Sequence, residues 1–109
     1  MAKRAHYYGD YQTPTWVVEL LLNENPLIGT EILEPCAGSG TIVEVIKRRR
    51  PRARVAAVEL RGEEENSLWI AGADEVHIAD FLTWKPAAVQ YDTIITNPPF
   101  MLGLFGASP

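Results

Sequence analysis

The sequence has few cysteines and histidines and no long apolar run, and each shortage excludes a class of protein. The single cysteine, Cys36, rules out an internal disulfide and fits a reducing compartment, so we expect a cytoplasmic protein. The two histidines, His6 and His77, have no metal-ligand spacing with Cys36 or with each other, which argues against a metal site. No apolar stretch approaches the ~20 residues of a membrane span, and the first residues lack a secretory signal.

The chain also lacks an excess of positive charge. Its formal net charge is −4, which argues against strong nucleic-acid binding by this segment alone. Basic residues gather between Lys47 and Arg54, at the end of an expected helix, where cations complement the helix dipole. We therefore favour a structural role for this run over contact with nucleic acid. The 109 residues, 47% of them hydrophobic, predict one small globular domain over 1–109, or part of a larger one.

Apolar periodicity predicts alternating helices and strands. Thr13 and Pro14 read as the N-cap and first position of a helix. Its apolar stripe is expected at Trp16, Val17, Leu20 and Leu21. Strands are expected over 30–36, 54–60, 75–82 and 91–96, and further helices over 41–50 and 62–71. This alternation predicts an α/β fold with right-handed βαβ units and a doubly wound parallel sheet.

Unusual polar residues and glycines fall where the expected strands end. In doubly wound sheets, ligands bind outside the carboxyl ends of the strands, so this placement predicts a single ligand site. If these were unrelated surface residues, they would fall equally at both ends. The residues are Glu34, Gly38, Gly40, Glu59, Asp80 and Asn97.

The segment Glu34-Pro35-Cys36-Ala37-Gly38-Ser39-Gly40 leads from a strand into a helix. Its glycines allow a tight turn, and the helix N-terminus behind them favours a carboxylate or phosphate. The segment is neither a P-loop nor the glycine triplet of dinucleotide folds. Glu59 follows about 20 residues later, where an acid can accept both hydroxyls of a ribose. A plain strand–helix turn and a solvated strand-end Glu are the alternatives; together the two features favour a nucleoside ligand.

Two further segments fit a nucleoside and a flat substrate. Asp80 can accept a hydrogen bond from an adenine amino group, and Phe81 can pack on the ring. The turn Asn97-Pro98-Pro99-Phe100 is stiff, because both prolines fix φ and restrict the residues before them. Its Asn97 side chain and a main-chain carbonyl can accept both hydrogens of an –NH2 group, and Phe100 offers a stacking face. The alternative is that Asn-Pro-Pro merely ends a strand.

Together these segments resemble the S-adenosylmethionine-dependent amino methyltransferases, in particular the adenine-N6 DNA methyltransferases of bacteria and phages. The resemblance runs from about Tyr11 to Phe100. It implies the Rossmann-like sheet of class I methyltransferases, with only the first four strands present. It also implies S-adenosylmethionine as cofactor, held by Gln12, Thr13, Pro14, Glu34, Cys36, Ala37, Gly38, Gly40, Glu59, Leu60, Asp80, Phe81 and Asn97. Asn97, Pro98, Pro99 and Phe100 match the catalytic motif.

The resemblance specifies a planar amino nitrogen better than it specifies DNA. The Asn-Pro-Pro-Phe motif also occurs in enzymes that methylate cytosine, RNA bases or protein glutamine. A non-enzymatic, truncated cofactor-binding subunit is a further alternative. DNA is the favoured partner, with the target adenine flipped out of the duplex. The uncovered edge of the fourth strand predicts pairing with a second copy or with a chain that completes the sheet.

Overall fold

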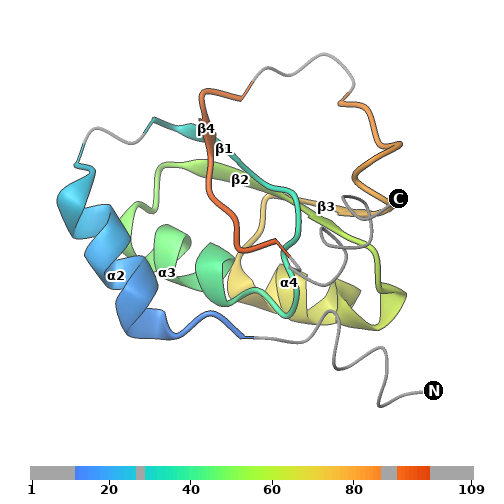
Figure 1. Ribbon diagram of the computed structural model, residues 1–109, viewed down its shortest axis with the longest axis horizontal. Coiled ribbons are helices and arrows are strands. Elements are labelled where there is room, and N and C mark those ends of the chain that lie inside the picture. The colour runs from blue at the N-terminus through green and yellow to red at the C-terminus, as the bar shows by residue number, and fades with distance from the viewer. Residues whose placement is uncertain (1–11, 27–28, 87–90, 99–109) are drawn as a thin grey trace, which may run out of the picture.

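The computed structural model describes residues 12–26, 29–86 and 91–98, which form a parallel sheet covered by helices (Figure 1). Strand order in this sheet is β3-β2-β1-β4. The elements are α2 (Thr15–Glu24), β1 (Glu31–Glu34), α3 (Thr41–Arg49), β2 (Arg54–Glu59), η1 (Gly62–Glu64), α4 (Glu65–Ala71), β3 (Glu75–Ile78) and β4 (Thr93–Ile94). No helix in the described ranges is long and apolar enough to cross a membrane.

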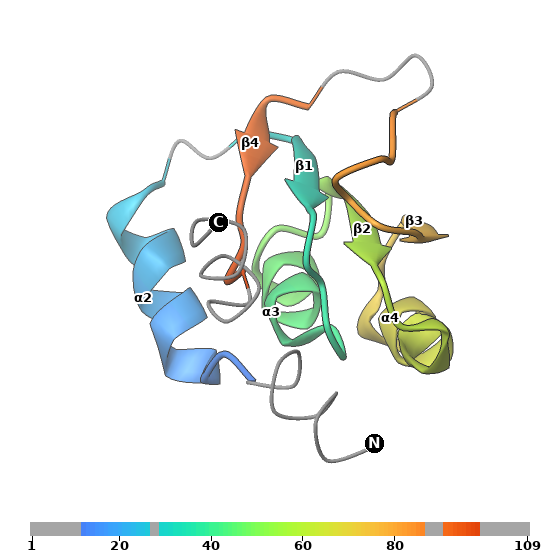
Figure 2. The same cartoon turned by 45° about the vertical axis from the view of Figure 1, so that its right-hand side comes forward.

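The main core lies between the sheet and the helices α2, α3 and α4, which all cover the same face (Figure 2). Ile32 of β1 and Val55 of β2 are register partners, and both are fully buried in this layer. Leu68 is the buried residue that α4 contributes. Alternation along the strands sends Leu33 and Val58 to the other face, where the connection from β3 to β4 packs over them.

The strand order reverses beside β1. β2 lies on one side of β1, and β4, which follows much later in the chain, lies on the other. Open α/β sheets bind ligands at such a reversal, outside the carboxyl ends of the strands. The residues that follow β1 and β4 are therefore the ones the fold brings to the expected ligand crevice.

The expected apolar stripe of the first helix is wrong. Val18 and Leu22 are the buried residues of α2, and they lie one turn apart. Trp16, at 67% exposure, is among the expected stripe residues that point away from the core. Consecutive apolar pairs on this helix allow two faces, and packing against α3 selects the face that includes Val18.

Each of the four expected strands is shorter than the sequence indicated, and β3 and β4 are shortened most. β3 ends at Ile78, so Asp80 lies beyond the strand, where its carboxylate accepts a hydrogen bond from Leu82 N–H. That turn takes the backbone out of the ladder. β4 has two residues, although flanking backbone bonds from Asp92 to Glu31 and from Ile95 to Leu33 extend its pairing with β1.

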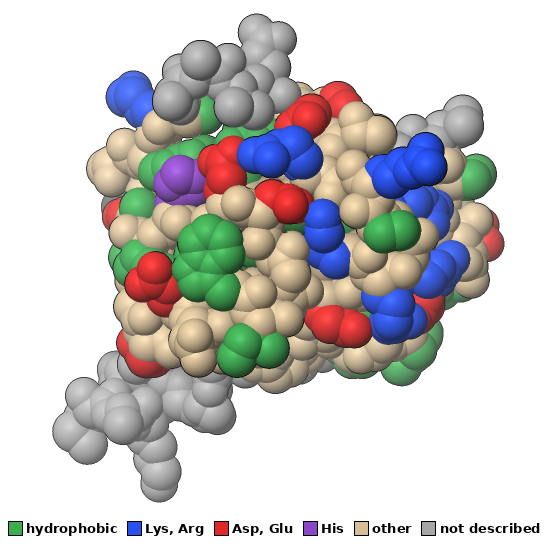
Figure 3. Space-filling view, turned by 180° about the vertical axis from the view of Figure 1, so that it is seen from behind, with side chains coloured by type: hydrophobic (Ala, Val, Ile, Leu, Met, Phe, Trp, Pro, Cys, Tyr) green, Lys and Arg blue, Asp and Glu red, His purple; other side chains and the backbone are tan. Residues whose placement is uncertain are grey.

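The basic run makes structural contacts with the neighbouring elements. Arg48 and Arg49 both pair with Glu19 of α2. Arg50 donates to the Leu22 carbonyl, and Lys47 pairs with Asp74, which precedes β3. These contacts fasten the end of α3 to its neighbours. Figure 3, which views the molecule from behind relative to Figure 1, shows Lys and Arg side chains gathered towards one side of this view, with acidic side chains among them.

Candidate functional site

Glu34 is a buried carboxylate at the carboxyl end of β1, the strand beside which the order reverses. Its side chain is fully buried, and Oε1 accepts a 2.7 Å hydrogen bond from Cys36 N–H. Oε2 has no hydrogen-bond partner within the part of the chain that the structure describes. Burial raises the pKa of Glu34 to about 7, and the Cys36 N–H and the Thr96 hydroxyl offset this only in part. The site therefore holds a buried acid with an acceptor position to fill.

Cys36, next to this carboxylate, is unsuited to nucleophilic chemistry. Burial and the nearby acids Glu34 and Glu59 raise the pKa of its thiol to about 11. A reactive cysteine needs the opposite shift, towards thiolate. Cys36 is a half-buried free cysteine at the start of the glycine turn, and its backbone N–H is the donor to Glu34.

The two glycines of the turn have different roles. Both adopt positive φ, +59° at Gly38 and +104° at Gly40, which L side chains rarely adopt. A Cβ on Gly40 would lie 2.9 Å from the Ala71 Cβ, so its absence lets α4 pack against the start of α3. A Cβ on Gly38 would meet only Arg61 Nη2, at 3.9 Å. Gly38 therefore borders the strand-end site, whereas Gly40 belongs to the packing beneath it.

Glu59 joins the end of β2 to the glycine turn. The residue is 6% exposed, and its Oε1 accepts a 2.6 Å hydrogen bond from Gly38 N–H. Oε2 accepts from Arg61 N–H at 3.0 Å and from Arg61 Nε at 2.9 Å. The sequence interpretation missed Arg61, although a basic residue two positions after the expected ribose-binding acid was the available signal.

Side chains before α2 link the glycine turn to the segment after β4. Gln12 Oε1 accepts hydrogen bonds from the Ser39 and Thr41 hydroxyls. Asn97 Nδ2 donates to Thr13 Oγ1 at 3.1 Å, across 84 residues of sequence. Thr13 was expected to cap α2, and that prediction is wrong: Pro14 occupies the N-cap position, and α2 has no side-chain cap.

The expected adenine-binding residues Asp80 and Phe81 follow β3 beside the end of β2, since Ala79 N–H donates to the Glu59 carbonyl. No described hydrogen bond or ion pair connects Asp80 with Glu34, Glu59 or Asn97. Phe81 lies beside Trp84, with ring centroids 6.1 Å apart, and Leu60 is 65% exposed. The remaining expected residues are Ala37, which is buried in the core; Pro98, which is exposed; and Pro99 and Phe100, which lie outside the described residues.

Comparison with known proteins gives no matching family model, but it gives similar proteins and structures. The type II methyltransferase M.CvrRI of Paramecium bursaria Chlorella virus XZ-6E is 27% identical over 84% of this chain and 24% of its own length. The release factor glutamine methyltransferase of Koribacter versatilis (strain Ellin345) is 29% identical over 65% of this chain and 27% of its own.

Among solved structures, TrmN from Thermus thermophilus has a TM-score of 0.65 at 25% identity, over 84% of this chain and 30% of that one. Coclaurine N-methyltransferase bound to N-methylheliamine and SAH has a TM-score of 0.61 at 19% identity, over 74% and 26%. The chain has the Rossmann-like fold of class I methyltransferases.

The methyltransferase fold is present here in part. The chain spans about a quarter of the length of the curated relatives it matches. What it does contain is the order β3-β2-β1-β4, with the glycine turn after β1 and an acid at the end of β2.

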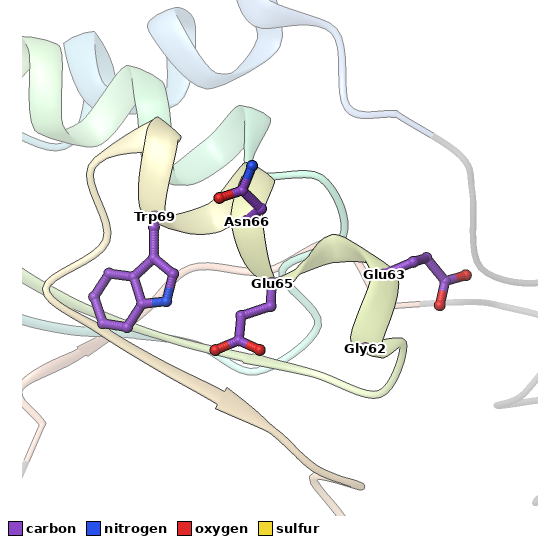
Figure 4. Close-up of a pocket in the computed structure, with 5 residues that line it drawn as sticks. All are labelled: Gly62, Glu63, Glu65, Asn66 and Trp69. Atoms are coloured by element: carbon purple, nitrogen blue, oxygen red, sulfur yellow. The ribbon is translucent and has the colours of Figure 1, made fainter.

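A surface hollow is lined by residues of η1 and α4. Figure 4 shows Glu63 pointing away from Trp69, so the polar groups do not converge on one point. None of the expected site residues of this methyltransferase fold lines the hollow. Its lining is Gly62, Glu63, Glu65, Asn66 and Trp69.

Proposed function

We propose that this chain is the cofactor-binding and catalytic part of an S-adenosylmethionine-dependent methyltransferase acting on a planar amino nitrogen. The observation that carries the proposal is the Thr13–Asn97 hydrogen bond at the strand-order reversal, where the neighbouring Thr96 hydroxyl interacts with buried Glu34. Because the Asn97 amide nitrogen is engaged, its carbonyl oxygen is left to accept from another donor. Adenine N6 in DNA is the proposed substrate.

The residues fit the cofactor at its positively charged end. S-adenosylmethionine carries a sulfonium and an ammonium, and Glu34 Oε2 is a buried acceptor without a described partner. In the proposal, the turn at Gly38 holds the methionine part and Glu59 holds the ribose. In the proposal, Asp80 and Phe81, which follow β3 beside the end of β2, hold the adenine.

The proposed mechanism depends on positioning. When bound, S-adenosylmethionine supplies an electrophilic methyl group on sulfur. An aromatic amino nitrogen is a poor nucleophile, because its lone pair is delocalised into the ring. The Asn97 side-chain carbonyl and the Pro98 main-chain carbonyl would accept the two amino hydrogens and favour tetrahedral geometry, which would localise the lone pair for in-line attack. The nitrogen–carbon bond would form as the methyl–sulfur bond breaks, the sulfur would leave as the thioether of S-adenosylhomocysteine, and the methylated nitrogen would release one proton to solvent. Such preorganised acceptors act through orientation and electrostatics, so no strong general base is required.

A second substrate class has a specific observation in its favour. The chain is 29% identical, over 65% of its length, to a release factor glutamine methyltransferase. A glutamine side chain also presents a planar –NH2 group, which the same two acceptors can bind. Assays of the complete protein with an adenine-containing oligonucleotide and with a glutamine-containing peptide distinguish the two substrates by which one gains methyl groups.

Calorimetry with S-adenosylmethionine tests the cofactor proposal on the chain itself. Glu59→Ala is expected to weaken binding by roughly 1.5–3 kcal/mol, the range for a hydrogen bond to a charged group. Glu63→Ala is the matched control, because it removes an exposed carboxylate from the next element and should leave the affinity unchanged.

Since Glu59 also holds Gly38 N–H, thermal unfolding must show that the variant is folded. Glu59→Gln, which keeps one acceptor for that N–H, serves as a second variant. Equal affinity in the folded variants would remove Glu59 from the site.

A further inference from the structure

Arg61 occupies acceptor positions on the one carboxylate that the proposed function assigns to the ribose. Its Nε lies 2.9 Å from Glu59 Oε2, and its own backbone N–H lies 3.0 Å from the same oxygen. Gly38 N–H donates a 2.6 Å hydrogen bond to Glu59 Oε1. A carboxylate offers roughly four acceptor positions, about two on each oxygen. Oε2 is therefore filled, and one position remains on Oε1.

A ribose diol binds a carboxylate best through both oxygens, and the present arrangement leaves room on only one of them. Of the bonds that Glu59 accepts, those from Gly38 N–H and Arg61 N–H come from the backbone and are set by the local turns. The bond from Arg61 Nε comes from a side chain, which can rotate away. The guanidinium is thus the group whose departure frees Oε2.

The position of the guanidinium supports the same conclusion. Arg61 Nη2 is 3.9 Å from where a Gly38 Cβ would stand, so the guanidinium lies against the glycine turn as well as against Glu59. The Arg61 side chain is 16% exposed and the Glu59 side chain 8%. A buried carboxylate without compensation is costly, and a nearby cation relieves that cost while the site holds no ligand. Glu64, 3.6 Å from Nη2 at the end of η1, is a second anion within reach of the guanidinium.

We propose that the Arg61 side chain is a placeholder for the ribose: it holds Glu59 in the empty site and leaves Oε2 when a nucleoside ligand binds. The proposal rests on the proposed function, since it assumes that Glu59 receives the ribose of the cofactor. It adds that Arg61 lowers cofactor affinity, because each binding event must break the Nε–carboxylate bond. Arg61 is an affinity-setting residue and not part of the chemistry.

The test is calorimetry on the intact chain with S-adenosylhomocysteine and, as an uncharged probe, adenosine. Arg61→Ala is expected to tighten binding of both by about 10- to 150-fold, the range for one hydrogen bond to a charged group. Arg61→Met should tighten binding similarly. Because Met keeps the packing of the aliphatic part of the side chain, this variant is expected to remain folded if Arg61→Ala does not. Arg52→Ala removes an equal charge from an exposed turn between α3 and β2 and should change neither affinity.

The outcomes separate the placeholder from the proposed function. If the wild type binds and the folded Arg61 variants bind equally or more weakly, the placeholder is wrong while the cofactor site stands. If neither the wild type nor any variant binds either probe, both proposals fail. A gain for S-adenosylhomocysteine without a gain for adenosine also contradicts displacement at the ribose.

The Arg61 Nε–H resonance gives an independent measurement of the same event. It should shift when S-adenosylhomocysteine saturates the chain, because its carboxylate partner is lost. An unchanged resonance at saturation would overturn the displacement.

Discussion

The two ends of the sheet both carry acids, but those acids have different partners. At the amino ends, Asp92 accepts from the backbone N–H groups of Thr30 and Glu31. Asp74 accepts from Val55 N–H and pairs with Lys47. At the carboxyl ends, Glu34 keeps a buried oxygen without a described partner, and Glu59 is held partly by a movable side chain.

This difference teaches how to separate structural polar residues from candidate functional ones. The amino-end acids accept backbone N–H groups where neighbouring strands begin, at Thr30 and Glu31 for Asp92 and at Val55 for Asp74, so their bonds are part of the fold. The carboxyl-end acids are more deeply buried, yet Glu34 is less satisfied. Buried polar groups are usually hydrogen-bonded, so an unsatisfied one indicates a site that a ligand completes.

The largest expected effect is at the carboxyl end, in a complete methyltransferase that contains this chain. Asn97→Ala should lower turnover by about 10²–10³-fold, as for the loss of one preorganised polar contact, because the amino group loses an acceptor in the transition state. Affinity for S-adenosylmethionine should change little. Methylation kinetics under saturating cofactor check this, and a variant that retains most of its turnover would contradict the amino-clamp mechanism.

The second prediction concerns Glu34 and pH. Its pKa is raised from 4.5 to about 7 in the folded chain, so folding favours the protonated form. This contribution to stability is complete below pH 4.5 and is lost as pH rises through about 7, by about 3 kcal/mol in total. Glu34→Gln stays neutral and should be the more stable protein at pH 8.

Urea unfolding of the wild type and Glu34→Gln between pH 5 and pH 8 measures this difference. The gap in the free energy of unfolding should widen with pH in favour of Glu34→Gln. The comparison isolates Glu34 because all other titrating groups are shared. Parallel curves would mean that the carboxylate ionises normally in the folded chain.

The smallest expected effect is at the amino end. Asp74→Ala removes the acceptor of Val55 N–H and the partner of Lys47, and should lower the free energy of unfolding by about 1–3 kcal/mol. Asp74→Asn keeps a neutral acceptor and should lose less. Cofactor affinity should be unchanged in both folded variants. Weaker cofactor binding by either variant would contradict the proposal that the amino-end acids are structural and the carboxyl-end acids functional.

Much of the arrangement could be predicted from sequence because it depends on local patterns. The run over 54–59 is apolar along almost its whole length, as expected for a strand buried on both faces. The helix expected over 41–50 is present as α3, which buries Ile42, Val45 and Ile46. The glycine turn could be placed because positive φ leaves few residues to choose from.

The sequence by itself determined the order of strands and helices, the parallel class of the sheet and the end at which Glu34 and Glu59 lie. Periodicity and turn chemistry are local properties, and the handedness of βαβ units converts them into topology. Only the tertiary structure decided which face of α2 is buried. It also decided that Ala71 packs against Gly40 and that the Arg61 side chain hydrogen-bonds Glu59. The Thr13–Asn97 contact was likewise decided only there, because it joins segments 84 residues apart and no local pattern encodes such a pairing.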